Sequence, residues 1–229
     1  MKNNVLLIDK PKGITSHDVV DEVRKLTGEQ KVGHAGTLDP MATGLLIVLV
    51  GRGATKRQSE FMGLEKEYVA EVTFGLETDT YDADGKTANR APLPAVRKLK
   101  RKDVEKELKS FGGFVEQQVP PYSAVKINGK PLYKYARGGR LDEITLPMRE
   151  VEIKKLELLE FYPMDSRANL LPKVRLRVVC SKGTYIRSLA YDLGKQLKIG
   201  GFLSQLRRTR IGNYSIEDAI TLSELPGVL

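Results

Sequence analysis

The sequence predicts an α+β fold, in which helices and loops flank a central mixed or mainly antiparallel sheet. Residues 68–74 and 174–178 alternate apolar and polar side chains, which is the period of a strand with one buried face. Residues 45–50 form an uninterrupted apolar run, and residues 15–28 carry an apolar stripe with helical spacing. Because strands and helices mix without regular βαβ alternation, this class is favoured over a doubly wound sheet.

The first predicted elements are a short strand and a capped helix. Val5–Ile8 is apolar and leads into Lys10-Pro11-Lys12-Gly13, where proline and glycine interrupt regular structure. Thr15 or Ser16 can cap the helix that follows, and Gly28 stands where a C-terminal glycine belongs. The apolar stripe of this helix consists of Val19, Val20, Val23 and Leu26.

A glycine-rich segment then separates this helix from the buried strand at residues 45–50. Residues 31–44, KVGHAGTLDPMATG, contain three glycines and a proline and are predicted to form a structured loop. Residues 79–85 are predicted to be an acidic turn after the strand at residues 68–74. Residues 92–94 and 165–172 are predicted to be exposed loops within one domain.

The remaining elements lie in the second half of the chain. Val104, Leu108 and Phe111 share one face of a predicted short helix that ends at Gly112-Gly113. The alternation at residues 174–178 predicts a strand that continues to Cys180, and a helix is predicted to begin near Thr184. Strand, turn and helix meet in this segment.

Composition indicates a globular protein with a polyanionic partner. The chain has 229 residues, of which 41% are hydrophobic, and 38 Lys and Arg against 29 Asp and Glu give a net charge of +9. A single cysteine, Cys180, cannot form an intramolecular disulfide and fits a reducing compartment. The apolar run at residues 45–50 is far shorter than the roughly 20 residues of a membrane helix, and Val5–Ile8 is too short for a signal-peptide core. We therefore predict a cytoplasmic protein.

The residue inventory argues against several cofactor chemistries. Two histidines, His17 and His34, and one cysteine are too few for the usual zinc deaminase, zinc protease or Cys/His hydrolase sites. Residues 80–85 resemble the start of a calcium loop, but Ala91 stands where the loop requires a bidentate Glu. The segment GRGATK at residues 51–56 lacks the spacing of a phosphate-binding loop. We predict neither a metal nor a cofactor.

One carboxylate stands out in the glycine-rich segment. Asp39 is the only acid between Glu29 and Glu60, and the small residues around it would let another molecule approach closely. An Asp-Pro pair taken alone is more often just a turn. The context, and not the pair, makes Asp39 a candidate catalytic group.

Five collinear blocks give the sequence a specific resemblance. The blocks are LIDKPKGITSHDVV, KVGHAGTLDPMATGLLIVLVGRGATK, KEYVAEVTFGLETDTYDADG, VPPYSAVKINGKPLYKYARGG and CSKGTYIRSLAYDLG. With these blocks the chain resembles, over about residues 5–215, the bacterial tRNA pseudouridine-55 synthases of the TruB type. The resemblance implies the pseudouridine synthase fold with an RNA-binding cleft, and isomerisation of the T-loop uridine of tRNA.

The resemblance also implies catalytic roles. The aspartate of the family's LDP motif is the catalytic carboxylate, which corresponds to Asp39 here. It attacks ribose C1′ or base C6, or it acts as a base. Tyr68 would stack against the target base, Tyr185 would line the base pocket, and Arg187 would pair with Asp39 and orient it. Without the resemblance, Tyr68 would be interpreted as strand packing and Arg187 as a surface residue.

Further residues are expected to bind the substrate. The target uridine must leave its stack, and the resemblance gives His34 the task of filling the vacated position. Lys10 and Pro11 match a family motif and would shape the pocket. Candidates for contact with RNA phosphates are Lys56, Arg137, Arg207 and Arg208.

Typical members of the resembled family continue into a small C-terminal RNA-binding PUA domain, for which we expect no room in this chain. We therefore expect a single catalytic domain over residues 1–229 without that domain, acting on the T arm of tRNA as a monomer that needs no protein partner. Three alternatives stay open. They are a non-catalytic RNA-binding or tRNA-folding protein, a pseudouridine synthase for another RNA, and the catalytic subunit of a guide-RNA complex.

Overall fold

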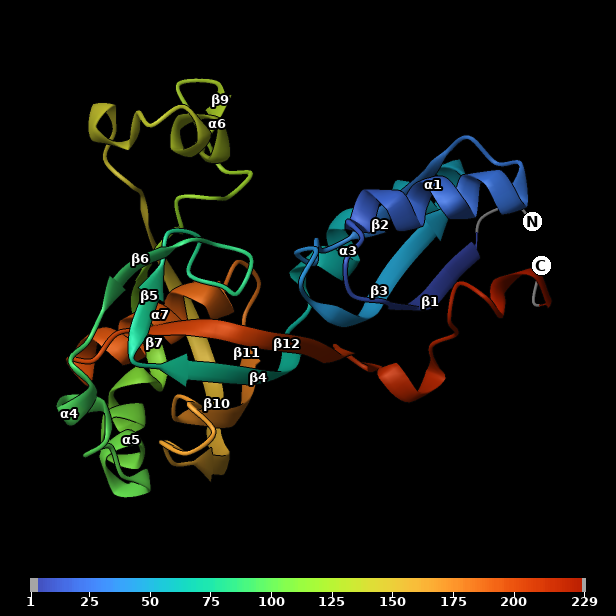
Figure 1. Cartoon of the computed structure of the whole chain (residues 1–229). Coiled ribbons are helices and arrows are strands. Elements are labelled where there is room, and N and C mark those ends of the chain that lie inside the picture. The colour runs from blue at the N-terminus through green and yellow to red at the C-terminus, as the bar shows by residue number, and fades with distance from the viewer. Residues whose placement is uncertain (1–3, 228–229) are drawn as a thin grey trace. The chain divides into compact units, whose positions relative to one another are not determined.

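The computed structural model describes residues 4–227 and is drawn in Figure 1. The chain divides into two compact units. The first comprises the residues up to Val69, residues 179–182 and the residues from Leu206 onward, and the second comprises residues 70–178 and 183–205. Strands β4 (Lys66–Phe74), β11 (Lys173–Cys180) and β12 (Gly201–Ile211) contribute residues to both. The expectation of a single domain stays a prediction.

The first unit is a small sheet covered by helices on both faces. Strand β3 is antiparallel to both β1 and β2, while the end of β12 is parallel to β3 and antiparallel to β13. The remaining elements of this unit are β1 (Asn4–Lys10), α1 (Ser16–Thr27), β2 (Val32–Ala35), β3 (Thr43–Val50), α2 (Arg52–Thr55), α3 (Gln58–Gly63), β13 (Tyr214–Ser215) and the 3₁₀ turns η3 (Ile216–Asp218) and η4 (Leu225–Gly227).

Strand β3 is apolar from Leu45 to Val50 because both of its faces are buried there. Leu46, Val48 and Val50 pack with the apolar stripe of α1, whereas the side chains between them pack with α2 and α3. Figure 1 shows α1 lying along β1 and β3. The predicted buried strand is thus confirmed, with its start at Thr43.

Helix α1 is capped as the sequence predicts. Thr15 accepts a hydrogen bond from the backbone of Asp18, whose carboxylate in turn accepts one from the Thr15 backbone, which makes a capping box. Gly28 ends the helix in a left-handed conformation. Ser16, the other predicted cap, is the first helical residue and is buried instead.

The loop predicted at residues 31–44 contains a strand. Val32–Ala35 forms β2, which pairs with β3 in the register Val32↔Val50 and Ala35↔Ile47. Val32 and Ala35 are buried at its two ends, a spacing that does not alternate and so gives no strand signal. Residues 36–42 remain a loop, and Asp39 lies in it.

The second unit is a sheet whose strands run in the order β12-β4-β11-β10-β7, with two small hairpins. Strands β10 and β7 are antiparallel, and so are the hairpin pairs β5-β6 and β8-β9. Its further elements are β5 (Leu76–Thr78), β6 (Thr87–Arg90), α4 (Leu93–Val96), α5 (Arg101–Leu108), η1 (Lys109–Phe111), β7 (Gly113–Gln118), β8 (Lys126–Ile127), β9 (Lys130–Pro131), α6 (Leu132–Arg137), η2 (Leu141–Glu143), β10 (Met148–Tyr162) and α7 (Ile186–Gln196).

Most predicted elements of this unit are present. The alternating burial of β4 and β11 confirms both strands. Helix α5 ends at Leu108, and a 3₁₀ turn carries the chain to Phe111. Helix α7 begins at Ile186, two residues after the predicted start near Thr184, with Tyr185 as its N-cap. The loop at residues 165–172 is confirmed, whereas the loop predicted at residues 92–94 is wrong, because a helical turn begins at Leu93.

The predicted α+β class with a mixed sheet is confirmed by these elements. Within residues 4–227, no helix is both long and apolar enough to cross a membrane.

Candidate active site

Asp39 sits on a short turn in the loop that joins β2 to β3. The backbone N–H of Ala42 donates to the Asp39 carbonyl at 3.0 Å, which closes the turn, and Asp39 itself is half-buried. Leu38 and Pro40, the residues before and after Asp39, are each held by a buried side chain from another part of the first unit.

Ser16 holds the residue before Asp39. Its hydroxyl donates to the Leu38 carbonyl at 3.1 Å and accepts from the Leu38 N–H at 2.8 Å. Ser16 is 1% exposed, so both bonds are shielded from water. One side chain from the first turn of α1 therefore satisfies both backbone groups of Leu38 and fixes the entry of the chain into Asp39.

Lys10 and Gly13 hold the residue after Asp39. The ammonium group of the fully buried Lys10 donates to the carbonyls of Pro11, Ile14 and Pro40, the last at 3.5 Å. The Gly13 N–H donates to the same Pro40 carbonyl at 2.8 Å. Burial lowers the pKa of Lys10, and the Asp39 carboxylate opposes that effect. The Lys-Pro motif thus supports the Asp39 turn through backbone carbonyls.

Tyr68 and Arg208 belong to the same cluster. Tyr68 is 9% exposed, and burial raises the pKa of its phenol, so the hydroxyl keeps its proton at neutral pH. The nearby charge of Arg208 acts in the opposite direction and favours the ionised phenol, while the charge of Asp39 raises the pKa of Tyr68 further. A carboxylate on a fixed turn, a protonated phenol and two buried cations, Lys10 and Arg208, are therefore gathered in the first unit. This set can supply a nucleophile or base together with a proton donor.

His34 lies at the edge of this loop, on β2. Burial lowers the pKa of its imidazole, and the charge of Arg208 lowers it further. The neutral ring is therefore favoured, and its backbone carbonyl accepts from the side chain of Gln58 at 2.6 Å. Within residues 4–227, no group hydrogen-bonds the buried Nδ1 of His34. A flat, uncharged ring of this kind suits stacking among bases.

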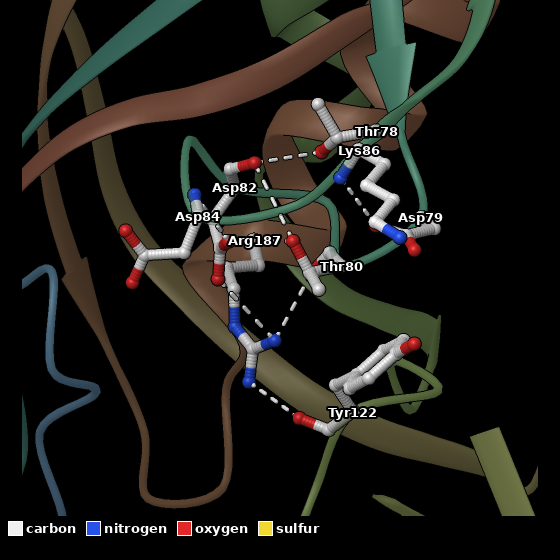
Figure 2. Close-up of polar contacts among 8 residues, drawn as sticks. All are labelled: Thr78, Asp79, Thr80, Asp82, Asp84, Lys86, Tyr122 and Arg187. Atoms are coloured by element: carbon white, nitrogen blue, oxygen red, sulfur yellow. Dashed lines mark hydrogen bonds and ion pairs between the residues drawn. The ribbon is translucent and has the colours of Figure 1, made fainter. Parts of the chain in front are cut away.

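In the second unit, Arg187 is buried at the start of α7 and surrounded by acceptors. Figure 2 shows its guanidinium turned toward Asp82, Thr80 and Tyr122. Nη1 donates to the Thr80 carbonyl and Nη2 to the Tyr122 carbonyl, both at 3.0 Å, and Nη1 lies 3.5 Å from the Asp82 carboxylate. The Arg187 and Asp82 side chains are each 6% exposed, so the ion pair is shielded from solvent.

Asp82 is itself fixed by the acidic turn around it. Its Oδ1 accepts from the Thr80 hydroxyl at 2.6 Å and from the Asp84 N–H at 3.1 Å, while the Thr78 hydroxyl donates to its backbone carbonyl. The other carboxylate oxygen faces Arg187. The turn that resembled a calcium loop thus serves to position an acid against a buried arginine.

Tyr185, the N-cap of α7, is held by a buried amide. The Gln117 side chain accepts from the Tyr185 N–H at 2.7 Å and donates to the Tyr185 carbonyl at 2.9 Å. Gln117 is 3% exposed. Gln117 therefore bonds to both backbone groups of Tyr185, a predicted site residue. Ser16 bonds in the same way to both backbone groups of Leu38, the neighbour of Asp39.

The four candidates for phosphate contact differ sharply in exposure. Lys56 and Arg137 are exposed, and the Arg137 guanidinium lies over the Tyr133 ring at 5.3 Å. Arg207 is partly exposed and forms a two-point ion pair with Asp9. Arg208, by contrast, is 1% exposed.

Two family models match consecutive parts of the chain. The model of the TruB family pseudouridylate synthase N-terminal domain matches residues 24–186, and that of the tRNA pseudouridylate synthase B C-terminal domain matches residues 187–228. The chain belongs to the TruB family of pseudouridylate synthases. The predicted resemblance to this family is thereby confirmed.

Individual TruB relatives match over nearly the whole chain. The tRNA pseudouridine synthase B of Desulfotalea psychrophila is 48% identical over 95% of this chain and 85% of its own length. The protein of the same name from Thermobifida fusca is 44% identical over 98% of this chain and 75% of its own length.

Two solved structures share the fold. A Cbf5-Nop10-Gar1 complex matches with a TM-score of 0.69 at 29% identity, over 97% of this chain and 53% of that chain. An H/ACA RNP bound to a substrate RNA containing 2′-deoxyuridine matches with a TM-score of 0.68 at 27% identity. This chain spans about half the length of the chains that it matches in these structures.

Three residues that hold predicted site residues or their neighbours in place are not predicted by the sequence. Its patterns place Asp82 only in an acidic turn and Ser16 only at a helix cap, and they give no signal for Gln117. Ser16 and Gln117 act on backbone groups far along the chain, which no local pattern announces. Asp82 lies in a block that carries the family resemblance, and its acidic turn was the only available signal.

Proposed function

We propose that this protein is a tRNA pseudouridine synthase that isomerises uridine-55 in the T loop, with the Asp39 carboxylate as its central catalytic group. The observation that carries the proposal is the double clamp on the Asp39 turn. Ser16 binds Leu38 on one side, and Lys10 binds the Pro40 carbonyl on the other. A group that must attack one atom of a bound nucleotide gains rate from being held in place before the substrate arrives.

The proposed reaction needs a carboxylate but no net change of oxidation state. The bond from ribose C1′ to uracil N1 breaks, the base turns, and C1′ bonds to C5. The C5 hydrogen leaves as a proton, and N1 carries a proton in the product. Asp39 attacks C1′ or C6, or removes a proton, and each route divides one difficult step into easier ones. No redox cofactor is required by this balance.

The other predicted site residues have defined tasks in this proposal. Tyr68 stacks against the target base, and Tyr185 lines the pocket that receives it. His34, whose neutral ring is favoured by burial, fills the stack that the base leaves. Arg187 pairs with Asp39 during the reaction, and the acceptors that now surround it keep its guanidinium in place.

RNA binding in this proposal relies on the excess of basic side chains. The net charge of +9 supports a polyanionic substrate, and Lys56 and Arg137 are exposed cations suited to RNA phosphates. The substrate is the T arm of tRNA, held in the predicted cleft. The names of the relatives support a tRNA enzyme over a guide-RNA subunit. In this proposal the enzyme acts alone, as a cytoplasmic monomer.

The test uses a synthetic T-arm RNA labelled with tritium at C5 of the T-loop uridine. Purified wild-type protein is incubated with this RNA in a chelator-treated buffer without nucleotides, and released tritium and pseudouridine are measured. We expect stoichiometric release of tritium, with pseudouridine at that uridine alone. A T arm with the label at a uridine of the stem serves as the matched control and should release none.

Two results would contradict the proposal in different ways. Tight binding of the T arm without release of tritium would favour the RNA-binding or tRNA-folding alternative. Release from the stem uridine at the same rate as from the loop would indicate a pseudouridine synthase with another substrate.

A further inference from the structure

Arg208 holds both ends of the loop that carries Asp39. Its Nε donates to the Leu45 carbonyl at 2.7 Å and its Nη2 to the Gly36 carbonyl at 3.0 Å. Gly36 opens the loop after β2, and Leu45 lies at the start of β3, so one guanidinium bridges the two sides. A rigid fork of donors is well suited to this task, because it can serve several acceptors from one fixed position.

The backbone of Arg208 packs equally closely against this loop. Gly44 is its partner in the parallel pairing of β12 with β3. A Cβ atom at Gly44, where φ is +103°, would lie 2.3 Å from the Arg208 carbonyl oxygen. Only glycine fits there, and the end of the Asp39 loop therefore rests directly on β12.

The same guanidinium reaches the second predicted catalytic residue. Arg208 lies close enough to the phenol of Tyr68 for its charge to act on the pKa of that phenol. One side chain thus holds the loop of Asp39 and lies near the ring that is proposed to stack on the base.

Arg208 is also buried, unlike its neighbour Arg207. Arg208 is 1% exposed, whereas the Arg207 side chain is 43% exposed and pairs with Asp9. Successive residues of a strand point to opposite faces, which separates the two arginines. An RNA phosphate needs an accessible cation, and Arg208 is buried and bonded to carbonyl oxygens.

We propose that Arg208 is a positioning residue, which holds the two ends of the Asp39 loop together on β12, and that it does not contact RNA phosphate. The inference rests on the proposed function, since its readout is pseudouridine formation. It assigns Arg208 a role different from the phosphate contact that the sequence suggested.

The test compares wild type with Arg208→Lys and Arg208→Gln, and with Arg207→Gln as a comparator that removes an accessible arginine. Single-turnover rate at saturating enzyme, T-arm Kd, and the dependence of Kd on salt are measured for each protein. Circular dichroism gives the folded fraction, and rates are expressed per folded molecule. Arg208→Lys keeps a cation of similar length, so the question stays answerable if Arg208→Gln fails to fold.

Positioning predicts a loss of rate without a loss of binding. A displacement of about 1 Å in an active site can cost about 100-fold in rate, so Arg208→Gln should lose about that much and Arg208→Lys less. T-arm Kd and its salt slope should stay at wild-type values. In Arg207→Gln, loss of a phosphate contact would instead lower the slope of log Kd against log salt by about 0.7 to 0.9.

The inference and the proposed function fail in distinguishable ways. An inactive wild type contradicts the proposed function. The inference alone is overturned if wild type is active and the Arg208 variants keep a normal single-turnover rate but bind the T arm more than tenfold less tightly. In that case the slope of log Kd against log salt would also be lower in the variants.

Discussion

Arg187 and Asp82 form a buried ion pair, with 3.5 Å between Nη1 and Oδ2 and only 6% of each side chain exposed. The guanidinium also donates to two backbone carbonyls, of Thr80 and Tyr122. Removing one partner of such a pair leaves an uncompensated buried charge, which costs more than the pair itself contributes. The pair therefore serves to hold the Arg187 guanidinium in one position.

Neutralising Asp82 should destabilise the protein and slow its reaction. Asp82→Asn keeps an acceptor oxygen for the turn but removes the negative charge that faces Arg187, so the free energy of unfolding should fall by about 3 kcal/mol. Urea unfolding measures this loss, and single-turnover assays should show a lower rate at unchanged T-arm affinity. The exposed neighbour Asp84 gives the matched control, and Asp84→Asn should change stability by less than about 0.5 kcal/mol. Equal effects of the two substitutions would contradict this role.

Ser16→Ala should affect catalysis, whereas Thr15→Ala should affect only stability. Ser16→Ala leaves both backbone groups of Leu38 without a partner, at a cost of about 1–3 kcal/mol, and loosens the turn of Asp39. Thr15→Ala removes the helix cap at a cost of about 1 kcal/mol and leaves the turn intact. Single-turnover rates per folded molecule should therefore fall only in Ser16→Ala. A similar fall in rate in both variants would mean that the effect comes from weakening helix α1 and not from loosening the Asp39 turn.

Gly44→Ala should be far more damaging than Gly13→Ala, although both glycines have a positive φ. At Gly13, φ is +95° and a Cβ would meet nothing within 4 Å, so the cost is backbone strain of about 1–2 kcal/mol. At Gly44 the Cβ would also collide with the backbone of Arg208. Thermal unfolding should show a modest drop in Tm for Gly13→Ala and a much larger one, or insoluble protein, for Gly44→Ala. Equal drops would mean that β3 and β12 are less closely packed than described.

Lys66 should make stability rise with pH in the alkaline range. Its side chain is buried with its ammonium group bonded to the carbonyls of Met62 and Leu64, and burial together with the charge of Arg208 lowers its pKa to about 8. The unfolded chain keeps this proton up to the ordinary value of 10.5. Between about pH 8 and pH 10.5 the unfolded state thus binds more protons, so raising the pH favours the folded state.

The comparison with Lys66→Met isolates this effect from other titrating groups. Urea unfolding of both proteins at pH 7.5, 9 and 10.5 gives the difference in their free energies of unfolding. This difference should move in favour of wild type as the pH rises. A constant difference, or a shift toward the variant, would mean that Lys66 keeps an ordinary pKa.

Patterns among neighbouring residues predicted the elements that have clear end signals or a regular alternation of buried and exposed side chains. The capping residue Thr15, the terminal glycine Gly28 and the alternation along β4 and β11 all describe structure that is set by nearby residues. Strand β2 was missed because its two buried residues do not alternate, and the helical turn at Leu93 was missed because prolines on either side suggested a loop. Short elements depend on packing more than on propensity.

The resemblance to a known family predicted the candidate catalytic residues. It did not predict the residues that hold them in place. Asp39 alone reads as a turn residue, and only its surrounding motif singled it out. Arg208 and Ser16 contact this loop from elsewhere in the sequence, and each bonds to backbone atoms that every residue possesses. Bonds to backbone atoms do not require a particular residue type in the loop, so the sequence carries no pattern for them. The positioning roles of Arg208 and Ser16 could therefore be inferred only once their burial and contacts were known.

The central claim is that the Asp39 carboxylate performs the chemistry, and Asp39→Asn tests it most directly. Asparagine keeps the shape of the side chain but lacks its negative charge, so the variant should still fold and bind the T arm. Under single-turnover conditions, we expect pseudouridine to stay below detection while T-arm Kd remains within about twofold of wild type, since the loss would be confined to the chemical step. Product formation by Asp39→Asn within about tenfold of the wild-type rate would contradict the account.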